Sequence, residues 1–126
     1  MQAATEHVGH SAGYPLIASD RVEGTAVYSD SGENVGRIER VMIDKRNGKV
    51  AYAIMSFGGF LGLGSEYYPV PWLKLHYNPE LEGYQVDVTA EELRNSPLKL
   101  EDEESMPKIE EERVMFNYYG APFYGS

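Results

Sequence analysis

The sequence predicts an all-β or mainly β protein, a small six-stranded barrel that is closed or nearly closed, with a short helix after the last strand. Six short runs of β-branched and aromatic residues, separated by turn-forming residues, are typical of a barrel or sandwich rather than of an α/β fold. The length of 126 residues suits one hydrophobic core, and 42% hydrophobic with 25% charged residues is ordinary for a globular chain. We therefore expect one domain at residues 15–98, between an N-terminal tail (1–14) and an acidic linker with an aromatic C-terminal tail (99–126).

The first two strands are expected at residues 25–29 and 35–44, on either side of a turn of small and polar residues. In the second strand the apolar residues alternate up to Ile38 and resume in the opposite phase at Val41. A β-bulge explains a slip of one residue, and small barrels bend their strands through such bulges. A helix would space these residues similarly at first, but the turn at residues 46–49 and the β-type run after it argue against one.

The third strand, residues 50–57, is apolar on both alternating faces, so we expect it to be the best buried. The fourth strand is expected at residues 66–72, and its prolines confine it to an edge or an end of the sheet. Two further short strands are expected at residues 73–77 and 84–88, separated by a turn rich in Asn, Pro and Gly.

Two helices are expected after the last strand. Thr89 and Glu92 have the spacing of a capping box, so a short helix should begin there and stop before Pro97. A second helix is expected to start near Pro107, a residue that is tolerated at a first helical position, and to end at Gly120.

Charge is distributed unevenly along the chain. The net charge of −9 divides into −1 for residues 1–79 and −8 for residues 80–126, and we expect the acidic run at residues 101–105 to be a solvated linker. Phosphate backbones are bound by clustered Lys and Arg, whereas the one basic grouping here, at residues 37–49, is interrupted by acidic side chains. We therefore expect no direct binding to nucleic acid.

The chain contains no cysteine, which excludes disulfide bonds, thiolate catalysis and sulfur-ligated zinc. Its first fourteen residues lack the basic start and the apolar run of a secretory signal, and no stretch approaches the ~18 apolar residues of a membrane span. We therefore expect a cytoplasmic protein that does not insert into a membrane.

The search for catalytic, metal and cofactor sites gives only weak candidates. His7 and His10 have a spacing that occurs in metal sites, but they lie in a tail with no partner carboxylate. His76 stands alone on a strand, without a nucleophile or an orienting acid. The glycine-rich loop at residues 58–64 lacks the lysine that a phosphate-binding loop requires. We expect no catalytic residue, no metal, no cofactor and no enzymatic activity.

Five segments in sequence order resemble the motifs of the PRC-barrel family, over about residues 16–96. Members of this family include the cytoplasmic domain of the H subunit of the photosynthetic reaction centre and the C-terminal domain of a bacterial ribosome-maturation factor. The chain is most similar to the stand-alone bacterial members. The resemblance implies a six-stranded barrel that serves as an interaction or assembly module, often as a homodimer, and not as an enzyme. The segments are GTAVY (24–28), GENVGRIERVMID (32–44), GKVAYAIMSF (48–57), the glycine-rich loop (58–64) and Pro71-Trp72.

Six residues within or beside these motifs are expected to have structural roles. Asp44 stands at the mouth of a turn, where its carboxylate can accept hydrogen bonds from turn amides. Trp72 is expected in the core, and glycines supply the turns. The six are Gly32, Asp44, Gly48, Gly58, Gly59 and Trp72.

Apolar residues in two segments are the candidates for a protein interface. The tip of the glycine-rich loop would expose apolar side chains unless something covers them. The aromatic tail needs an apolar surface, either on this barrel or on a neighbour. The candidates are Phe60, Leu61 and Leu63 in the loop, and Phe116, Tyr118, Tyr119, Phe123 and Tyr124 in the tail.

The sequence therefore favours a non-enzymatic interaction module that forms a symmetric homodimer through the loop tip, the tail or both; any other protein partner is unidentified. One alternative is an accessory similar to the reaction-centre protein named above, which would place Glu39, Asp44 and Glu66 near a quinone or an electron carrier. Another is a ribosome-assembly helper whose acidic C-terminal third binds a basic ribosomal protein.

Overall fold

The computed structural model describes residues 15–58 and 66–125, and it confirms the mainly β fold with six strands. A short helix precedes the first strand, a 3-10 turn lies between the fourth and fifth strands, and two helices follow the last strand. The elements are α2 (Ser19–Val22), β1 (Ala26–Tyr28), β2 (Asn34–Asp44), β3 (Lys49–Phe57), β4 (Glu66–Pro71), η1 (Trp72–Lys74), β5 (Leu75–Asn78), β6 (Gly83–Val86), α3 (Ala90–Arg94) and α4 (Ile109–Tyr119).

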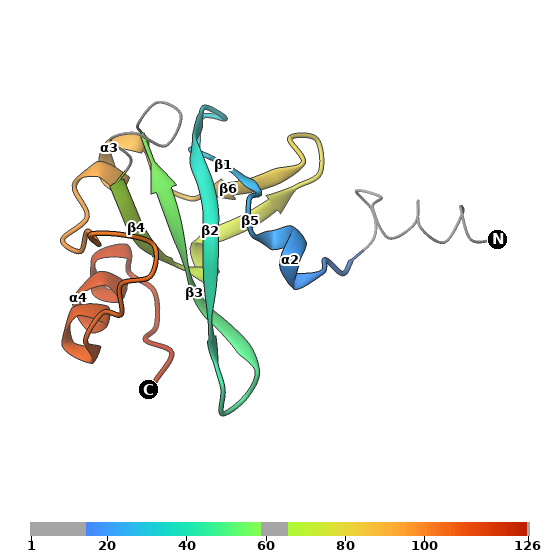
Figure 1. The fold of residues 1–126 in the computed structure, drawn as a ribbon. Coiled ribbons are helices and arrows are strands. Elements are labelled where there is room, and N and C mark those ends of the chain that lie inside the picture. Colours follow the sequence, from blue (N-terminus) through green and yellow to red (C-terminus); the bar gives the residue numbers. More distant parts are fainter. Residues whose placement is uncertain (1–14, 59–65, 126) are drawn as a thin grey trace.

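The six strands form one sheet in the order β4-β3-β2-β1-β6-β5, curled into a half-barrel (Figure 1). All neighbouring strands are antiparallel except β1 and β6, which run parallel. The prediction that β4 lies at an edge is confirmed, and Tyr67 in this strand forms a bridge to Leu100 in the segment after α3. The C-terminal segment therefore covers the edge of β4.

The predicted bulge in β2 is confirmed, because the pairing with β3 shifts between Ile38 and Arg40. A second shift, which the sequence analysis did not predict, lies between Met42 and Ile43. Bulges increase the local twist and bend of a strand, which lets the long β2 pair with both β1 and β3 in a curled sheet.

β2 and β3 approach each other so closely at Gly36 that a side chain cannot fit there. A Cβ atom at this position would lie 1.8 Å from the backbone oxygen of Ser56. Glycine is therefore required at Gly36 by contact with neighbouring backbone rather than by an unusual φ angle.

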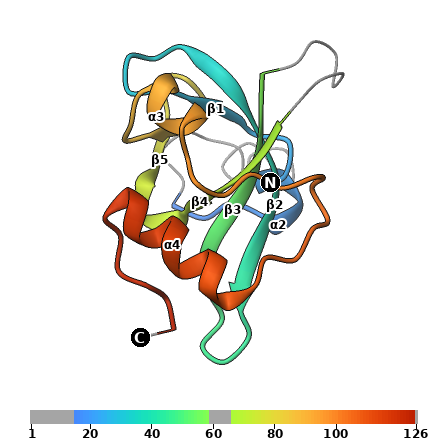
Figure 2. The same ribbon diagram turned by 90° about the vertical axis from the view of Figure 1, so that its left-hand side faces the viewer.

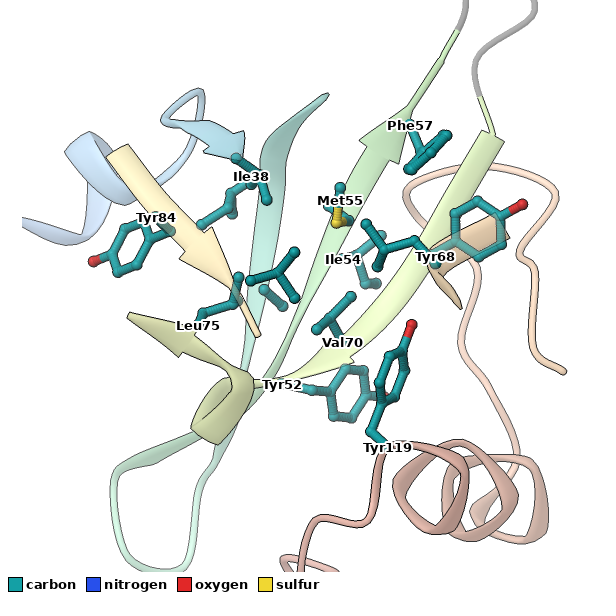
Figure 3. Close-up of a cluster of buried hydrophobic side chains, with 14 of the residues drawn as sticks. Ile38, Tyr52, Ile54, Met55, Phe57, Tyr68, Val70, Leu75, Tyr84 and Tyr119 are labelled. Carbon is teal, nitrogen blue, oxygen red and sulfur yellow. The ribbon is translucent and has the colours of Figure 1, made fainter. Parts of the chain in front are cut away.

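β3 is the most deeply buried strand, as predicted, with every residue from 51 to 57 buried. Figure 3 shows side chains of β3 and β4, among them Ile54, Met55 and Val70, gathered with Ile38 from β2. The core also receives side chains from α3 and α4, including Leu93 and Met115, both fully buried.

Both predicted helices are present. The Thr89 hydroxyl accepts a hydrogen bond from the Glu92 amide (3.0 Å), and the Thr89 amide donates to the Glu92 carboxylate (2.9 Å). α4 ends at Gly120, which has a left-handed φ of 67°. The fifth strand begins at Leu75, two residues later than predicted, because residues 72–74 form the 3-10 turn η1.

Candidate interaction surface

The turn between β2 and β3 is organised around Asp44. Its carboxylate accepts hydrogen bonds from the backbone amide of Arg46 (3.0 Å) and from the Arg46 guanidinium (3.0 and 2.9 Å). The Asp44 carbonyl accepts from the amide of Gly48 (2.8 Å), and the Asn47 side chain accepts from the amide of Lys49 (2.9 Å). Asp44 thus accepts hydrogen bonds from amides of the turn, as expected from the sequence. It also pairs with the Arg46 guanidinium, which the sequence analysis did not predict.

These bonds hold a β hairpin that extends well beyond the rest of the sheet (Figure 1). Lys45, Arg46 and Lys49 are exposed around the turn, and 55% of the Ile43 side chain next to it is exposed. Because the turn is fixed by its own hydrogen bonds, these side chains are presented on a preorganised support, which lowers the entropic cost of binding.

Replacing Asp44 with asparagine should lower the melting temperature by roughly 5 °C at neutral pH, because the charge-assisted bonds to Arg46 are lost. The Arg46 side chain and amide hold the pKa of Asp44 below its ordinary value. A lowered pKa stabilises the fold above the ordinary carboxyl pKa, and that stability disappears as the pH falls through the lowered value. The difference in melting temperature between wild type and Asp44→Asn should therefore become smaller below about pH 4. A difference that becomes larger in acid would contradict this prediction.

The aromatic tail packs on the chain's own sheet. Phe116 is 3% exposed and Tyr119 is 5% exposed, and the Phe116 ring lies edge-on to Tyr52 of β3 with centroids 6.1 Å apart. Phe123 and Tyr124 fold back onto Phe116, at 5.5 and 5.7 Å. Four of the five tail residues proposed as an interface are thus core or half-buried residues of this chain, because α4 turns its apolar side toward the sheet.

A buried carboxylate, that of Glu112, holds this tail in place through hydrogen bonds. Glu112 on α4 is 7% exposed and accepts hydrogen bonds from the hydroxyls of Tyr52 and Tyr124, both at 2.5 Å. Burial and the neighbouring carboxylate raise the pKa of Tyr52, and they raise that of Tyr124 to about 12, so both phenols remain donors at neutral pH. The sequence analysis missed Glu112, although it shares the spacing of the apolar side of α4, residues 112, 115, 116 and 119.

The remaining interface candidates divide into two groups. Tyr118 is 39% exposed, and its hydroxyl donates to the backbone carbonyl of Glu92 in α3 (2.7 Å). Gly59 and the candidates Phe60, Leu61 and Leu63 lie outside the described residues. Among the five tail candidates, Tyr118 is therefore the exposed one, whereas Phe123 and Tyr124 are half-buried and Phe116 and Tyr119 are buried.

Trp72 and its neighbour Leu73 lie where the sheet meets the projecting hairpin. The Trp72 ring is half-buried and packs on Tyr84, with centroids 5.2 Å apart. Leu73 is 63% exposed, and η1, which carries it, contacts β3. Trp72 thus joins the margin of the core, whereas Leu73 adds apolar surface beside the hairpin.

The three carboxylates considered for a proton-handling surface are not brought together. Asp44 lies in the β2–β3 turn, and Glu66 lies opposite Phe57 at the other end of β3, paired with Lys99 at 2.9 Å. Glu39 borders a shallow polar hollow of about 650 Å³ that Glu103 also lines. Partial burial acts to raise the pKa of Glu39, but hydrogen bonds, chiefly from Arg37, lower it overall, whereas the contact with Glu39 raises the pKa of Glu103.

Within residues 15–58 and 66–125, no three His, Asp or Glu side chains are grouped as metal ligands would be. His76 is exposed on β5. None of the helices in the part of the chain that the structure describes is long and apolar enough to cross a bilayer.

The family model described as PRC-barrel domain matches residues 16–93, which contain all six strands and most of α3. α4 and the aromatic tail lie outside that match. No curated protein matches the chain.

Proposed function

Since this chain belongs to the PRC-barrel family, we propose that it is a non-enzymatic interaction module that associates with a second copy of itself. The fold provides a small rigid support, and PRC-barrel domains are generally non-catalytic. The proposal concerns which part of that support binds the second copy.

The exposed aliphatic side chains beside the projecting hairpin carry the proposal. Ile43 pairs with Val50 across the β2–β3 ladder. Leu73 lies two residues after Pro71, which pairs with Tyr52 on the other side of β3. The register therefore places the two exposed side chains, Ile43 and Leu73, on the two segments that flank β3 near the base of the hairpin. Covering such a side chain contributes about 1.5–3 kcal/mol, and a two-fold dimer buries each position twice.

The test is the solution mass of the full chain by light scattering over a wide concentration range. Wild type should form a dimer, and Ile43→Ser with Leu73→Ser should raise the dimer dissociation constant at least about tenfold. Leu16→Ser is the matched control, because Leu16 is 68% exposed but lies before α2, away from the hairpin. A wild type that stays monomeric throughout, or a double variant that dimerises like wild type, would refute the proposal.

A second candidate, an accessory that handles protons beside an electron carrier, is favoured by the carboxyl pair Glu39 and Glu103. Their pKa values move in opposite directions, which suits groups that share a proton. The separation of Asp44 from Glu66 weighs against it, since no continuous acidic surface results. A monomeric wild type recovered with electron-transfer subunits from a membrane fraction would favour this candidate over self-association.

A further inference from the structure

The turn of the projecting hairpin is a positive surface on an acidic protein. Between residues 44 and 49 stand three cations and one carboxylate, in a chain of net charge −9. The carboxylate, Asp44, is bound to Arg46, so Lys45 and Lys49 face solvent without a carboxylate within ion-pair distance in the described part of the chain. With the exposed Ile43 beside them, these residues form what we call the basic tip, residues 43–49.

A negatively charged segment lies between α3 and α4. Residues 101–104 are all acidic, and Met106, 68% exposed, follows them. We call residues 101–106 the acidic segment. None of the ion pairs among the described residues involves Glu101 or Glu104. The acidic segment thus combines uncompensated negative charge with an exposed apolar side chain, that of Met106. The basic tip likewise combines positive charge with the exposed side chain of Ile43.

Resting on the proposed self-association, we infer that the basic tip of one copy docks on the acidic segment of a second copy. Lys45 and Lys49 lie against the carboxylates of the partner copy, and Ile43 lies against its Met106. Complementary charge selects this pairing, because two basic tips or two acidic segments would repel each other.

The acidic segment lies beside the base of the hairpin that carries the basic tip, which permits a closed pair. The Arg40 guanidinium, near the base of the hairpin, donates to the carbonyl of Glu103 in the acidic segment (3.1 Å). Tyr52, on the other strand of the hairpin, bonds to Glu112 in the first turns of α4. Figure 2 shows the hairpin turn extending below α4, so it projects away from its own acidic segment. A two-fold axis between adjacent surfaces forms both contacts at once and leaves neither open for a filament.

Two charge-reversed full-length variants test the inference. In the first, Lys45→Glu and Lys49→Glu make the basic tip negative. In the second, Glu101→Lys, Asp102→Asn and Glu104→Lys change the net charge of the acidic segment from −4 to +1. None of these three carboxylates takes part in an ion pair among the described residues, and the asparagine oxygen can still accept the hydrogen bonds that Asp102 accepts from the Glu104 amide and the Ser105 hydroxyl. Each variant alone should have a dimer dissociation constant at least about tenfold higher than wild type, because each contact becomes repulsive.

Mixing the two variants in equal amounts should restore the dimer mass. Each negative tip then meets a positive segment, and each unchanged basic tip meets an unchanged acidic segment. Glu80→Lys with Glu82→Lys changes the net charge by as much as the first variant, in the opposite sign, but lies in the turn between β5 and β6, where neither carboxylate takes part in an ion pair among the described residues. This control should leave the wild-type dissociation constant within about twofold.

The outcomes separate this inference from the proposed function. A wild type that is monomeric at every concentration overturns the self-association itself. A dimeric wild type whose charge-reversed variants remain dimeric, or a mixture of variants that stays monomeric while circular dichroism shows both folded, overturns only the docking of tip on segment. Restoration of the dimer in the mixture supports it, because loss of stability in either variant cannot produce it.

Discussion

Replacing Phe116 with alanine should destabilise the protein by about 3–5 kcal/mol and release α4 from the sheet. The Phe116 ring contacts Tyr52, Phe123 and Tyr124, so its removal leaves a cavity at the centre of the aromatic cluster. Loosening α4 also exposes Glu112 to water. The hydrogen bond from the Tyr124 hydroxyl to Glu112 then no longer holds Tyr124 folded back.

Chemical denaturation measures the loss of stability, and limited proteolysis measures the release of the tail. Val114→Ala is the matched control, because Val114 lies on the same helix but is 54% exposed. It should change the free energy of unfolding by less than about 0.5 kcal/mol. If Phe116→Ala unfolds at the same denaturant concentration as this control, the tail does not contribute to the core as described.

Replacing Gly36 with alanine should destabilise the protein by about 3 kcal/mol or more, which lowers the melting temperature by roughly 10 °C. The added Cβ would lie 1.8 Å from the carbonyl oxygen and 2.9 Å from the carbonyl carbon of Ser56, and backbone atoms cannot move aside as a flexible side chain can. Relief requires β2 and β3 to separate at the centre of the sheet.

Gly24→Ala distinguishes this clash from the general effect of replacing a glycine. Gly24 has a φ of 87° and no atom within 4 Å of an added Cβ, so only the backbone preference is lost, about 1 kcal/mol. The melting temperature of Gly36→Ala should therefore be well below that of Gly24→Ala. Equal melting temperatures would mean that the strands accommodate the methyl group by a small local shift.

Much of the fold followed from local patterns that the sequence carries within a few residues. The phase slip between Ile38 and Val41 predicted the bulge, the prolines of β4 predicted an edge, and Thr89 with Glu92 predicted the start of α3. Each of these signals concerns a backbone requirement that only a few residue types satisfy, and such requirements are visible without knowledge of the tertiary structure.

The tail and its carboxylate could not be derived in this way. The bond between Tyr52 and Glu112 joins residues 60 positions apart, and only the three-dimensional packing of α4 on the sheet brings them together. The aromatic residues of the tail were recognised as needing an apolar surface, but composition does not say whether that surface belongs to the same chain. Likewise, residues 37–49 were interpreted as an interrupted basic grouping, because the sequence does not reveal that the Asp44 carboxylate pairs with the Arg46 guanidinium.

The position of α4 also affects how the protein is made. Synthesis proceeds from the N-terminus, so the sheet strands leave the ribosome before the helix that completes their packing. Until Met115, Phe116 and Tyr119 arrive, the nascent chain has its strands but lacks part of its core. Folding is therefore completed only after α4 has emerged, and a message truncated before the codons of this helix would yield a product that chaperones and proteases recognise as unfinished.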